Sequence, residues 1–299
     1  MSRGRKENKM PKLTISGFGD EICEDFGKQL ETMASFGLDH IDPRGVDGKN
    51  ISDLTADEAQ KAKKQLDEHG FKVACVGSPI GKYDITADFA PELEKFKRTL
   101  ETTLILGADC IRIFSFFIPS GHSPDEYRDE VMLRLGRYLE ASEGSGVLLL
   151  HENEHAIYGE DAAHCLDIAR TMASPRLKLI FDPCNFIFAG IEPYPYAFNM
   201  LRDCIFALHI KDGKSSPPTV TPTGLGEGRI AEMMAELYRV GFSGFATIEP
   251  HLGSFKGLAQ FESVLKLSEL PQGGAQTFKV ALSAFEKAAS AAGYETPSL

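Results

Sequence analysis

The sequence predicts an α/β protein that folds as a (β/α)8 barrel, and two observations support this fold class. Eight short apolar segments, each of the length of a buried strand, alternate with amphipathic segments of helical period. Glycines that suit the left-handed end of a helix precede five of these strands, at Gly37, Gly70, Gly107, Gly146 and Gly241. Alternating strands and helices form a parallel sheet, and eight such units favour closure into a barrel.

The individual elements follow from the same pattern. Short apolar runs predict strands at residues 13–17, 40–42, 72–77, 110–114, 147–152, 178–182, 206–211 and 245–249. Amphipathic spacing predicts helices at 25–36, 55–69, 91–106, 124–143, 161–172 and 278–292. Ser52 or Thr55 precedes acidic residues, so one of them is expected to cap the helix that begins there.

We expect one domain, because no linker divides the 299 residues and barrels of this kind use about 250. Residues 1–11 are basic and polar and are expected to form a disordered tail, with the barrel over 12–299. A long insertion at about 251–277 separates the last strand from the last helix. Its length suits a lid or an oligomer contact at the rim, or a plain surface excursion with a short helix.

Composition argues against several classes of protein. The net charge of -11 does not suit a nucleic-acid surface, although a local basic pocket is compatible with it. No apolar run reaches the roughly 18 residues of a membrane helix, and the polar start lacks the apolar part of a secretory signal. The cysteines form no CxxC pair, which is typical of reduced thiols. We therefore expect a cytoplasmic protein that binds neither nucleic acid nor membrane.

Four residues lie where a predicted strand ends: Glu152, Asp182, His209 and Glu249. The carboxyl ends of barrel strands meet at one rim, where barrel enzymes carry their active sites. One such residue alone is more often a solvated rim residue or a helix cap, but four together predict a single site. Carboxylates this close repel each other unless a cation neutralises them. Three carboxylates and an imidazole suit one divalent ion of Mn, Mg, Co or Zn.

These strand ends belong to a series of motifs that resembles a known family. In chain order the motifs are GFGDEI, RGVDGKN, GSPIGK, IRIFSFF, HENEH, FDPCN, HIKD and TIEPH, and the resemblance covers about residues 12–292. They are similar to those of the xylose-isomerase-like TIM-barrel superfamily, the group of sugar phosphate isomerases and epimerases. The resemblance implies a single divalent metal held by Glu152, Asp182, His209 and Glu249.

Two positions depart from the pattern of the epimerases in that superfamily. Asn185 stands where those members commonly carry a histidine, and Ser215 stands where they tend to carry an arginine. Both epimerase and lyase chemistry therefore stay open. Endonuclease IV, a more distant relative, needs more histidines at strand ends than this chain has, so a DNA repair role is not expected.

The four residues are expected to support proton transfer on a sugar or sugar derivative. A carbon next to a carbonyl is a weak acid, and a metal that binds adjacent sugar oxygens stabilises the enediolate. Glu152 and Glu249 could act as bases on the two faces of the sugar, which gives epimerisation, or one could move the proton between adjacent carbons, which gives isomerisation. The alternatives are a lyase or dehydratase on the same scaffold and a sugar-binding barrel without catalysis.

The expected substrate is a small sugar or keto-sugar, and the chain is compatible with a homo-oligomer. Candidate substrate contacts follow strands at the same rim, namely Arg44, Ser115, His155, Asn185, Lys211 and His251. Each has an alternative role. Lys211 could form a salt bridge with Asp212, Asn185 could cap the following helix, and the two histidines could support neighbouring side chains.

Two further motifs have more than one interpretation. HENEH has the spacing of the zinc motif H-E-x-x-H, but it follows a strand instead of lying within a helix, so a zinc protease is not expected. TGLGEGRI leads into a helix, and its backbone N–H groups could bind a phosphate, although a plain turn is the more frequent explanation. Within HIKD, strand alternation predicts that His209 and Lys211 both point inward.

Overall fold

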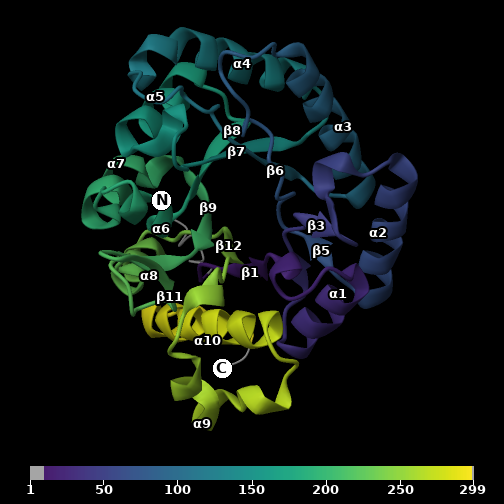
Figure 1. Cartoon of the computed structure of the whole chain (residues 1–299), viewed down its shortest axis with the longest axis vertical. Coiled ribbons are helices and arrows are strands. Elements are labelled where there is room, and N and C mark those ends of the chain that lie inside the picture. The colour runs from purple at the N-terminus through teal and green to yellow at the C-terminus, as the bar shows by residue number, and fades with distance from the viewer. Residues whose placement is uncertain (1–9, 298–299) are drawn as a thin grey trace, which may run out of the picture.

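The first and last strands of the chain lie side by side, and this pairing joins the two ends of the barrel (Figure 1). The computed structural model describes residues 10–297, so nearly all of the expected tail at 1–11 lies outside the described residues. β1 (Thr14–Gly17) runs parallel to β12 (Phe245–Ile248). A single sheet continues from this pair in the order β1-β12-β9-β8-β7-β6. Its other members are β6 (Cys110–Ile113), β7 (Leu148–Glu152), β8 (Leu177–Phe181) and β9 (Ile205–Ile210).

Two short strands fill the gap between β1 and β6. β2 (His40–Ile41) and β5 (Lys72–Val73) are parallel to each other. On one side the backbone N–H of Asp42 donates to Gly17 O at 3.0 Å, and on the other side Val76 forms a parallel bridge with Ile111. The strands therefore close the (β/α)8 barrel that the sequence predicts.

The third predicted strand, at 72–77, pairs regularly only over β5. Beyond β5 the backbone bonds to both neighbours, because Gly77 N donates to Pro43 O at 3.0 Å while Val76 N donates to Cys110 O at 2.9 Å. Gly77 also lets the backbone approach an aromatic ring, since a Cβ there would lie 2.7 Å from Phe18. The segment keeps its place in the barrel without a single continuous partner.

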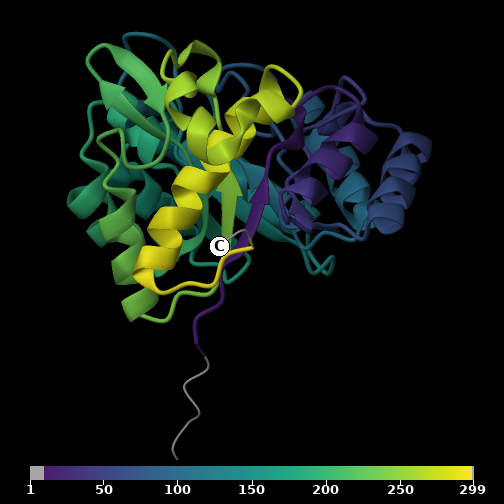
Figure 2. The same cartoon turned by 90° about the horizontal axis from the view of Figure 1, so that it is seen from below.

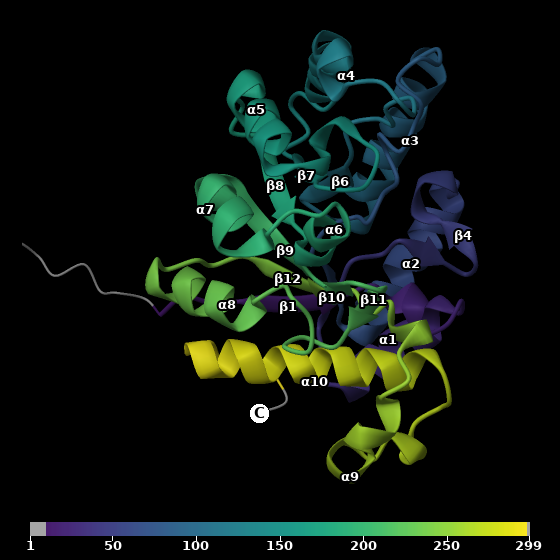
Figure 3. The same cartoon turned by 60° about the vertical axis from the view of Figure 1, so that its left-hand side comes forward.

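Helices cover the outside of the barrel (Figures 1 and 3). The expected helices are confirmed as α1 (Phe26–Ser35), α2 (Ala56–His69), α3 (Ala90–Leu106), α4 (Arg128–Ala141), α5 (Ala162–Met172) and α10 (Gly274–Ala292). Further helices are α6 (Pro183–Phe188), α7 (Phe198–Leu201) and α8 (Ile230–Arg239). Thr55, one of the two expected caps, forms a capping box with Glu58 at the start of α2.

Two antiparallel hairpins extend the loops that follow β2 and β9. The first joins β3 (Gly45–Val46) to β4 (Lys49–Asn50), and the second joins β10 (Asp212–Ser215) to β11 (Pro218–Thr221). Both begin within a few residues of a carboxyl strand end. They therefore belong to the rim at which the predicted site lies.

The interior of the barrel changes from apolar to charged along the strands. On the amino-terminal side of the charged residues a small apolar core fills the barrel, made of Cys75, Cys110, Leu150, Ile180 and Ala207. Above it Ser16 and Thr247 share a hydrogen bond of 3.1 Å, and Thr247 donates to Asp42 at 3.0 Å. A larger apolar core packs between the strands and the helices. Because side chains alternate along a strand, the same strands line the barrel interior and bury the helices.

The insertion at about 251–277 contains short helical turns and α9 (Glu262–Leu265), which lies on the side of α10 that faces away from the barrel (Figures 1 and 3; Figure 2 gives a view from below). Leu252 and Leu267 are buried, and Gln276 at the start of α10 donates to Leu267 O at 2.7 Å. The short helix that one interpretation expected is present. A role of the segment as a lid or oligomer contact stays a prediction.

The state of the cysteines and the character of the helices can be compared with what the composition indicates. All six cysteines are free thiols, which agrees with the absence of a CxxC pair. Within residues 10–297, none of the helices combines the length and the apolar character that crossing a membrane requires.

The packing of α10 against β1 generates a stability prediction. Phe278 of α10 is fully buried, and a Cβ on Gly17 would lie 2.4 Å from its ring. We predict that Phe278→Ala lowers the free energy of unfolding by about 3–5 kcal/mol, because it leaves a large cavity. Urea unfolding followed by circular dichroism measures this change. Leu104→Ala, at a surface position of α3 that is 50% exposed, is the control and should stay within about 0.5 kcal/mol of the parent. Equal midpoints for both variants would contradict the packing role of Phe278.

Candidate metal centre

Four neighbouring strands bring the predicted ligand residues together. Glu152 ends β7, Asp182 follows β8, His209 lies in β9 and Glu249 follows β12. All four are buried, none more than 5% exposed. Each offers one ligand atom, and these atoms lie within 4.8 Å of one another. The structure thus gathers at one point the side chains that the sequence places at four strand ends.

His209 lies between two of the carboxylates. Its Nδ1 is 2.9 Å from Glu152 Oε1 and 3.4 Å from Glu249 Oε2. Burial favours the neutral imidazole, but the two carboxylates outweigh burial and raise the pKa of His209 to about 9. In the protein without an ion, the imidazole therefore carries the proton that holds these two carboxylates together.

Among the four residues, Asp182 has the carboxylate whose negative charge its neighbours balance least. Its Oδ1 caps α6 by accepting from Asn185 N at 3.0 Å, and Asn153 binds the backbone of Asp182 on both its N–H and its carbonyl. Its Oδ2 is 2.7 Å from Lys211 Nζ but makes no well-aligned hydrogen bond within the described part of the chain. Burial, together with repulsion from Glu249 and Glu152, raises the pKa of Asp182 to about 7 despite Lys211.

These donors fit a divalent cation. Asp182 Oδ2 is a buried carboxylate oxygen without a hydrogen bond among the described residues, and it faces two further carboxylates and an imidazole. A cation at this point would satisfy the oxygen and remove the repulsion that raises the pKa of Asp182. Oxygen donors with one imidazole suit Mn, Mg, Co or Zn.

Arg112 of β6 is a site residue that the sequence analysis missed. The buried guanidinium donates from Nη1 to Glu152 Oε2 at 3.1 Å and also binds the carbonyls of Gly77 and Ser78. Burial raises the pKa of Glu152, but His209 and Arg112 outweigh it and lower this pKa to about 2. The sequence feature that could have identified Arg112 is the strand pattern I-R-I. Alternation turns Arg112 inward when Ile111 and Ile113 face the helices.

Lys211 points inward, as alternation within HIKD predicts. Its Nζ lies 2.7 Å from Asp182 Oδ2 and 3.3 Å from Glu249 Oε2, and the residue is 8% exposed. The alternative of a salt bridge between Lys211 and Asp212 is wrong. Asp212 is occupied elsewhere, because its carboxylate accepts backbone N–H groups from Gly213, Gly224, Gly226 and Gly228 at 2.8–3.2 Å.

The same contacts decide between the two interpretations of TGLGEGRI. Three N–H groups of this loop, from Gly224, Gly226 and Gly228, already bind the Asp212 carboxylate. A Cβ on Gly226 would lie 2.1 Å from Asp212 Oδ1, so the turn is tight around that side chain. The phosphate cradle is therefore wrong and the plain turn is correct.

A second group of residues surrounds the outer oxygen of Glu249. Arg44 Nη1 and His251 Nδ1 each lie 3.4 Å from Glu249 Oε1. Glu21, which the sequence analysis did not single out, holds both of them, at 3.4 Å from Arg44 Nη2 and 3.0 Å from His251 Nδ1. Burial raises the pKa of Glu21 in spite of these cations. Arg44 also donates to Asp20 at 2.8 Å, so contacts with three carboxylates fix the position of its guanidinium.

A polar cavity of ≈ 360 Å³ opens above the cluster. Four of the predicted substrate contacts line it, namely Arg44, Asn185, Lys211 and His251, together with Asn50, Lys82, Arg112, Glu152, Glu154 and Glu249. Asn185 does not cap α6, because Asp182 does so. The Asn185 amide instead donates to Asn153 O at 2.9 Å and lies 3.4 Å from Glu152 Oε1.

The other two predicted contacts are not brought to this cavity. Ser115 falls on the outer face of the barrel wall, where its hydroxyl meets His151 Nε2 at 2.9 Å and Gly159 N at 2.7 Å. The His155 side chain is 76% exposed and pairs with Glu160 at 2.5 Å. Strand alternation explains the first case, because Ser115 is an odd number of residues from the inward Arg112.

Comparison with known proteins agrees with the fold. No curated protein matches the chain in sequence. Among solved structures, an L-ribulose 3-epimerase is 17% identical, with 95% of this chain and 96% of that chain covered at a TM-score of 0.70. The IolI protein with a zinc atom is 15% identical (93% and 98% covered, TM-score 0.70). The probable 3-DHS dehydratase AsbF from Bacillus anthracis is also 15% identical (92% and 98% covered, TM-score 0.70).

At these identities the solved structures establish the shared fold alone. The family itself follows from a sequence model described as xylose isomerase-like TIM barrel, which matches residues 30–267 of this chain. This match spans most of the barrel and all four converging residues. The chain therefore belongs to the xylose isomerase-like TIM barrel family.

Proposed function

We propose that the protein is a divalent-metal-dependent isomerase or epimerase of a sugar or sugar derivative, which moves a proton through an enediolate. The observation that carries this proposal is the buried set of Glu152, Asp182, His209 and Glu249, of which Glu152 and Glu249 line a polar cavity. Similarity in fold to an L-ribulose 3-epimerase and to a zinc-containing IolI protein supports it.

The four residues of this set would hold the ion, and manganese, magnesium, cobalt or zinc would suit them. When bound, the ion supplies positive charge that lowers the cost of negative charge on a substrate oxygen. Arg112 and Lys211 keep Glu152 and Glu249 ionised, because each cation lies within 3.3 Å of one of these carboxylates. Both carboxylates are therefore held in the ionised form that a proton acceptor requires.

Glu152 and Glu249 are the proposed acid–base pair. β8 and β9 separate β7 from β12 in the sheet, so the two carboxylates reach the cavity from different sides. A base on each side removes the proton from one face of the sugar and returns it to the other, which is epimerisation. One base that returns the proton to the adjacent carbon gives isomerisation. Arg44, Asn185, Lys211 and His251 line the cavity and are the proposed contacts for sugar oxygens.

A lyase is the second candidate, and the position of Lys211 favours it. After a base removes the proton next to the carbonyl, the C–O bond to a β-hydroxyl breaks and a C=C bond forms. The departing oxygen needs a proton, and the Lys211 ammonium lies in the cavity wall beside Asp182 and Glu249. The structural likeness to a probable dehydratase agrees with this alternative.

The remaining proposals concern the cellular location of the protein and its partners. Free cysteines and the net charge of -11 favour a cytoplasmic protein that acts on small molecules without a nucleic-acid partner. The segment at 251–277 is the proposed site for a lid or for contact with a second copy of the chain.

Removal of either proposed base tests the chemistry. We predict that Glu152→Gln and Glu249→Gln each lower the rate of proton exchange by about 10²–10⁴-fold, because the amide cannot accept the proton. The measurement is incorporation of deuterium into ketoses and 3-keto sugars in D₂O by NMR, with water loss recorded in parallel. Exchange without water loss indicates an isomerase or epimerase, and water loss indicates the lyase. Glu101→Gln on the surface of α3 is the control, and loss of exchange in neither active-site variant would contradict the assignment.

Removal of the ion tests the cofactor. We predict that chelation lowers the melting temperature and abolishes turnover, and that Mn, Mg, Co or Zn restores both. An ion present at about 100 times its dissociation constant stabilises the folded state by about 2.7 kcal/mol. Asp182→Asn keeps the cap of α6 but should lose this thermal shift, whereas Asp129→Asn at a fully exposed position should retain it. A thermal shift that persists in Asp182→Asn would contradict the proposed ligand set.

A further inference from the structure

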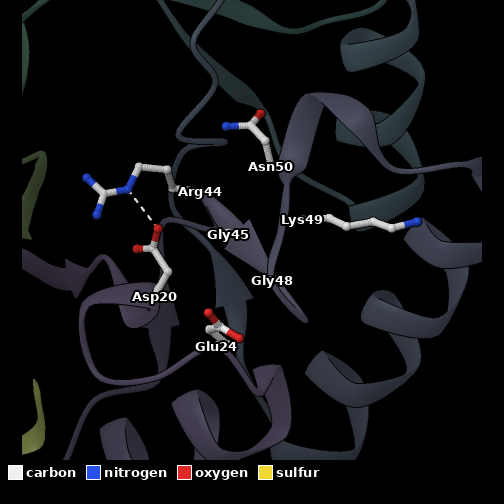
Figure 4. Close-up of a pocket in the computed structure, with 7 residues that line it drawn as sticks. All are labelled: Asp20, Glu24, Arg44, Gly45, Gly48, Lys49 and Asn50. Atoms are coloured by element: carbon white, nitrogen blue, oxygen red, sulfur yellow. Dashed lines mark hydrogen bonds and ion pairs between the residues drawn. The ribbon is translucent and has the colours of Figure 1, made fainter.

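A second cavity adjoins the one above the proposed metal ligands. It has a volume of ≈ 350 Å³ and is lined by Asp20, Glu24, Arg44, Gly45, Gly48, Lys49 and Asn50 (Figure 4). Arg44 and Asn50 also line the first cavity. The two cavities therefore share these two side chains in their walls, and Arg44 also contacts Glu249 directly.

The wall of the second cavity is a firmly held hairpin. Asp47 and Gly48 form the turn between β3 and β4, both with positive φ, and Asp47 Oδ1 accepts from Phe26 N at 2.9 Å. Val46 is 4% exposed, and a Cβ on Gly45 would lie 3.0 Å from Asp20. The hairpin is thus anchored to α1 and to the loop after β1, so the cavity is pre-formed.

The lining offers hydrogen-bonding groups that no other described residue uses. The Glu24 carboxylate has no hydrogen bond or ion pair within the described residues, and Asp20 Oδ1 is a buried oxygen without a partner there. Arg44 and Asn50 extend to the same side, whereas Lys49 extends to the opposite side (Figure 4), and Lys49 pairs with Glu58. Free carboxylate oxygens beside a guanidinium and an amide suit the hydroxyls of a neutral sugar, and they would repel a phosphate.

The sizes of the two neighbouring cavities, ≈ 350 and ≈ 360 Å³, point to the same class of ligand. Small-molecule sites typically measure about 300–1,000 Å³, so either cavity alone is at the small end of that range. A single sugar ring placed over Glu152 and Glu249 would leave the second cavity empty of substrate. A ligand with two rings would place its linkage beside Arg44 and Asn50 and its second ring beside Glu24.

We propose that the second cavity binds the second ring of a two-ring substrate, so that the enzyme acts on a glycosidically linked keto-sugar in preference to a free monosaccharide. This inference rests on the proposed function, because the first ring occupies the proposed site. Hydroxyls of the second ring donate to Glu24 and to Asp20 Oδ1, and Arg44 and Asn50 bind oxygens near the linkage.

The test compares one-ring and two-ring probes on the metal-loaded protein. The probes are the 3-keto derivatives of glucose, maltose and cellobiose, and the readout is kcat/KM for deuterium incorporation in D₂O. We expect at least one two-ring probe to exceed 3-ketoglucose by about 10- to 100-fold, as one or two hydrogen bonds to charged groups allow. Glu24→Trp, which fills the cavity from an exposed position, should reduce that ratio by a similar factor. Glu101→Gln should leave the ratio unchanged.

Two outcomes would overturn the inference. Equal kcat/KM for one-ring and two-ring probes is one, and a ratio that survives Glu24→Trp is the other. If no probe exchanges with any metal, the proposed function fails, and calorimetric binding of the same probes then decides about the cavity. Binding of a two-ring probe at least about 10-fold tighter than 3-ketoglucose, lost in Glu24→Trp, supports the cavity as a second-ring site. Equal binding overturns it.

Discussion

The burial of three carboxylates and an imidazole within 4.8 Å of one another is the constraint on which the rest of the site depends. Ionised carboxylates are expensive to remove from water unless cations neutralise them. The barrel meets this requirement from its own strands and the segments that follow them, because Arg112, Lys211 and Arg44 each pair with a carboxylate of the cluster. Even so, one oxygen of Asp182 stays without a hydrogen bond among the described residues. The proposed ion would neutralise the remaining negative charge of the cluster. The side-chain cations would then be free to face a substrate.

Strand periodicity made most of this arrangement predictable from the sequence. A barrel brings all carboxyl strand ends to one rim, so residues far apart in the chain, such as Glu152 and Glu249, could be placed together from spacing alone. Period-2 alternation also gave the inward direction of His209 and Lys211 correctly. Both rules act through the backbone, and they do not depend on which side chains happen to lie nearby.

The features that the sequence did not predict depend on side-chain partners across the barrel. Arg112 lies within an apolar strand, and the residues of that strand do not indicate which carboxylate it will contact. The glycine-rich loop kept two interpretations, a plain turn and a phosphate site, because the partner that decides for the turn, Asp212, lies before it across a hairpin. The second cavity arises where the loop carrying Asp20 meets the hairpin after β2, and neither segment alone indicates a hollow. Such pairings are decided by tertiary packing, which a local pattern does not contain.

The most direct test of the proposed metal site is anomalous diffraction from crystals grown with zinc, measured above and below the zinc absorption edge. If the four residues hold the ion, one peak is expected about 2.0–2.2 Å from one atom of each of Glu152, Asp182, His209 and Glu249. A peak instead at Glu21, Glu249 and His251, whose ligand atoms also lie within 4.8 Å of one another, would contradict it. So would the absence of any peak while Lys211 stays paired with Asp182.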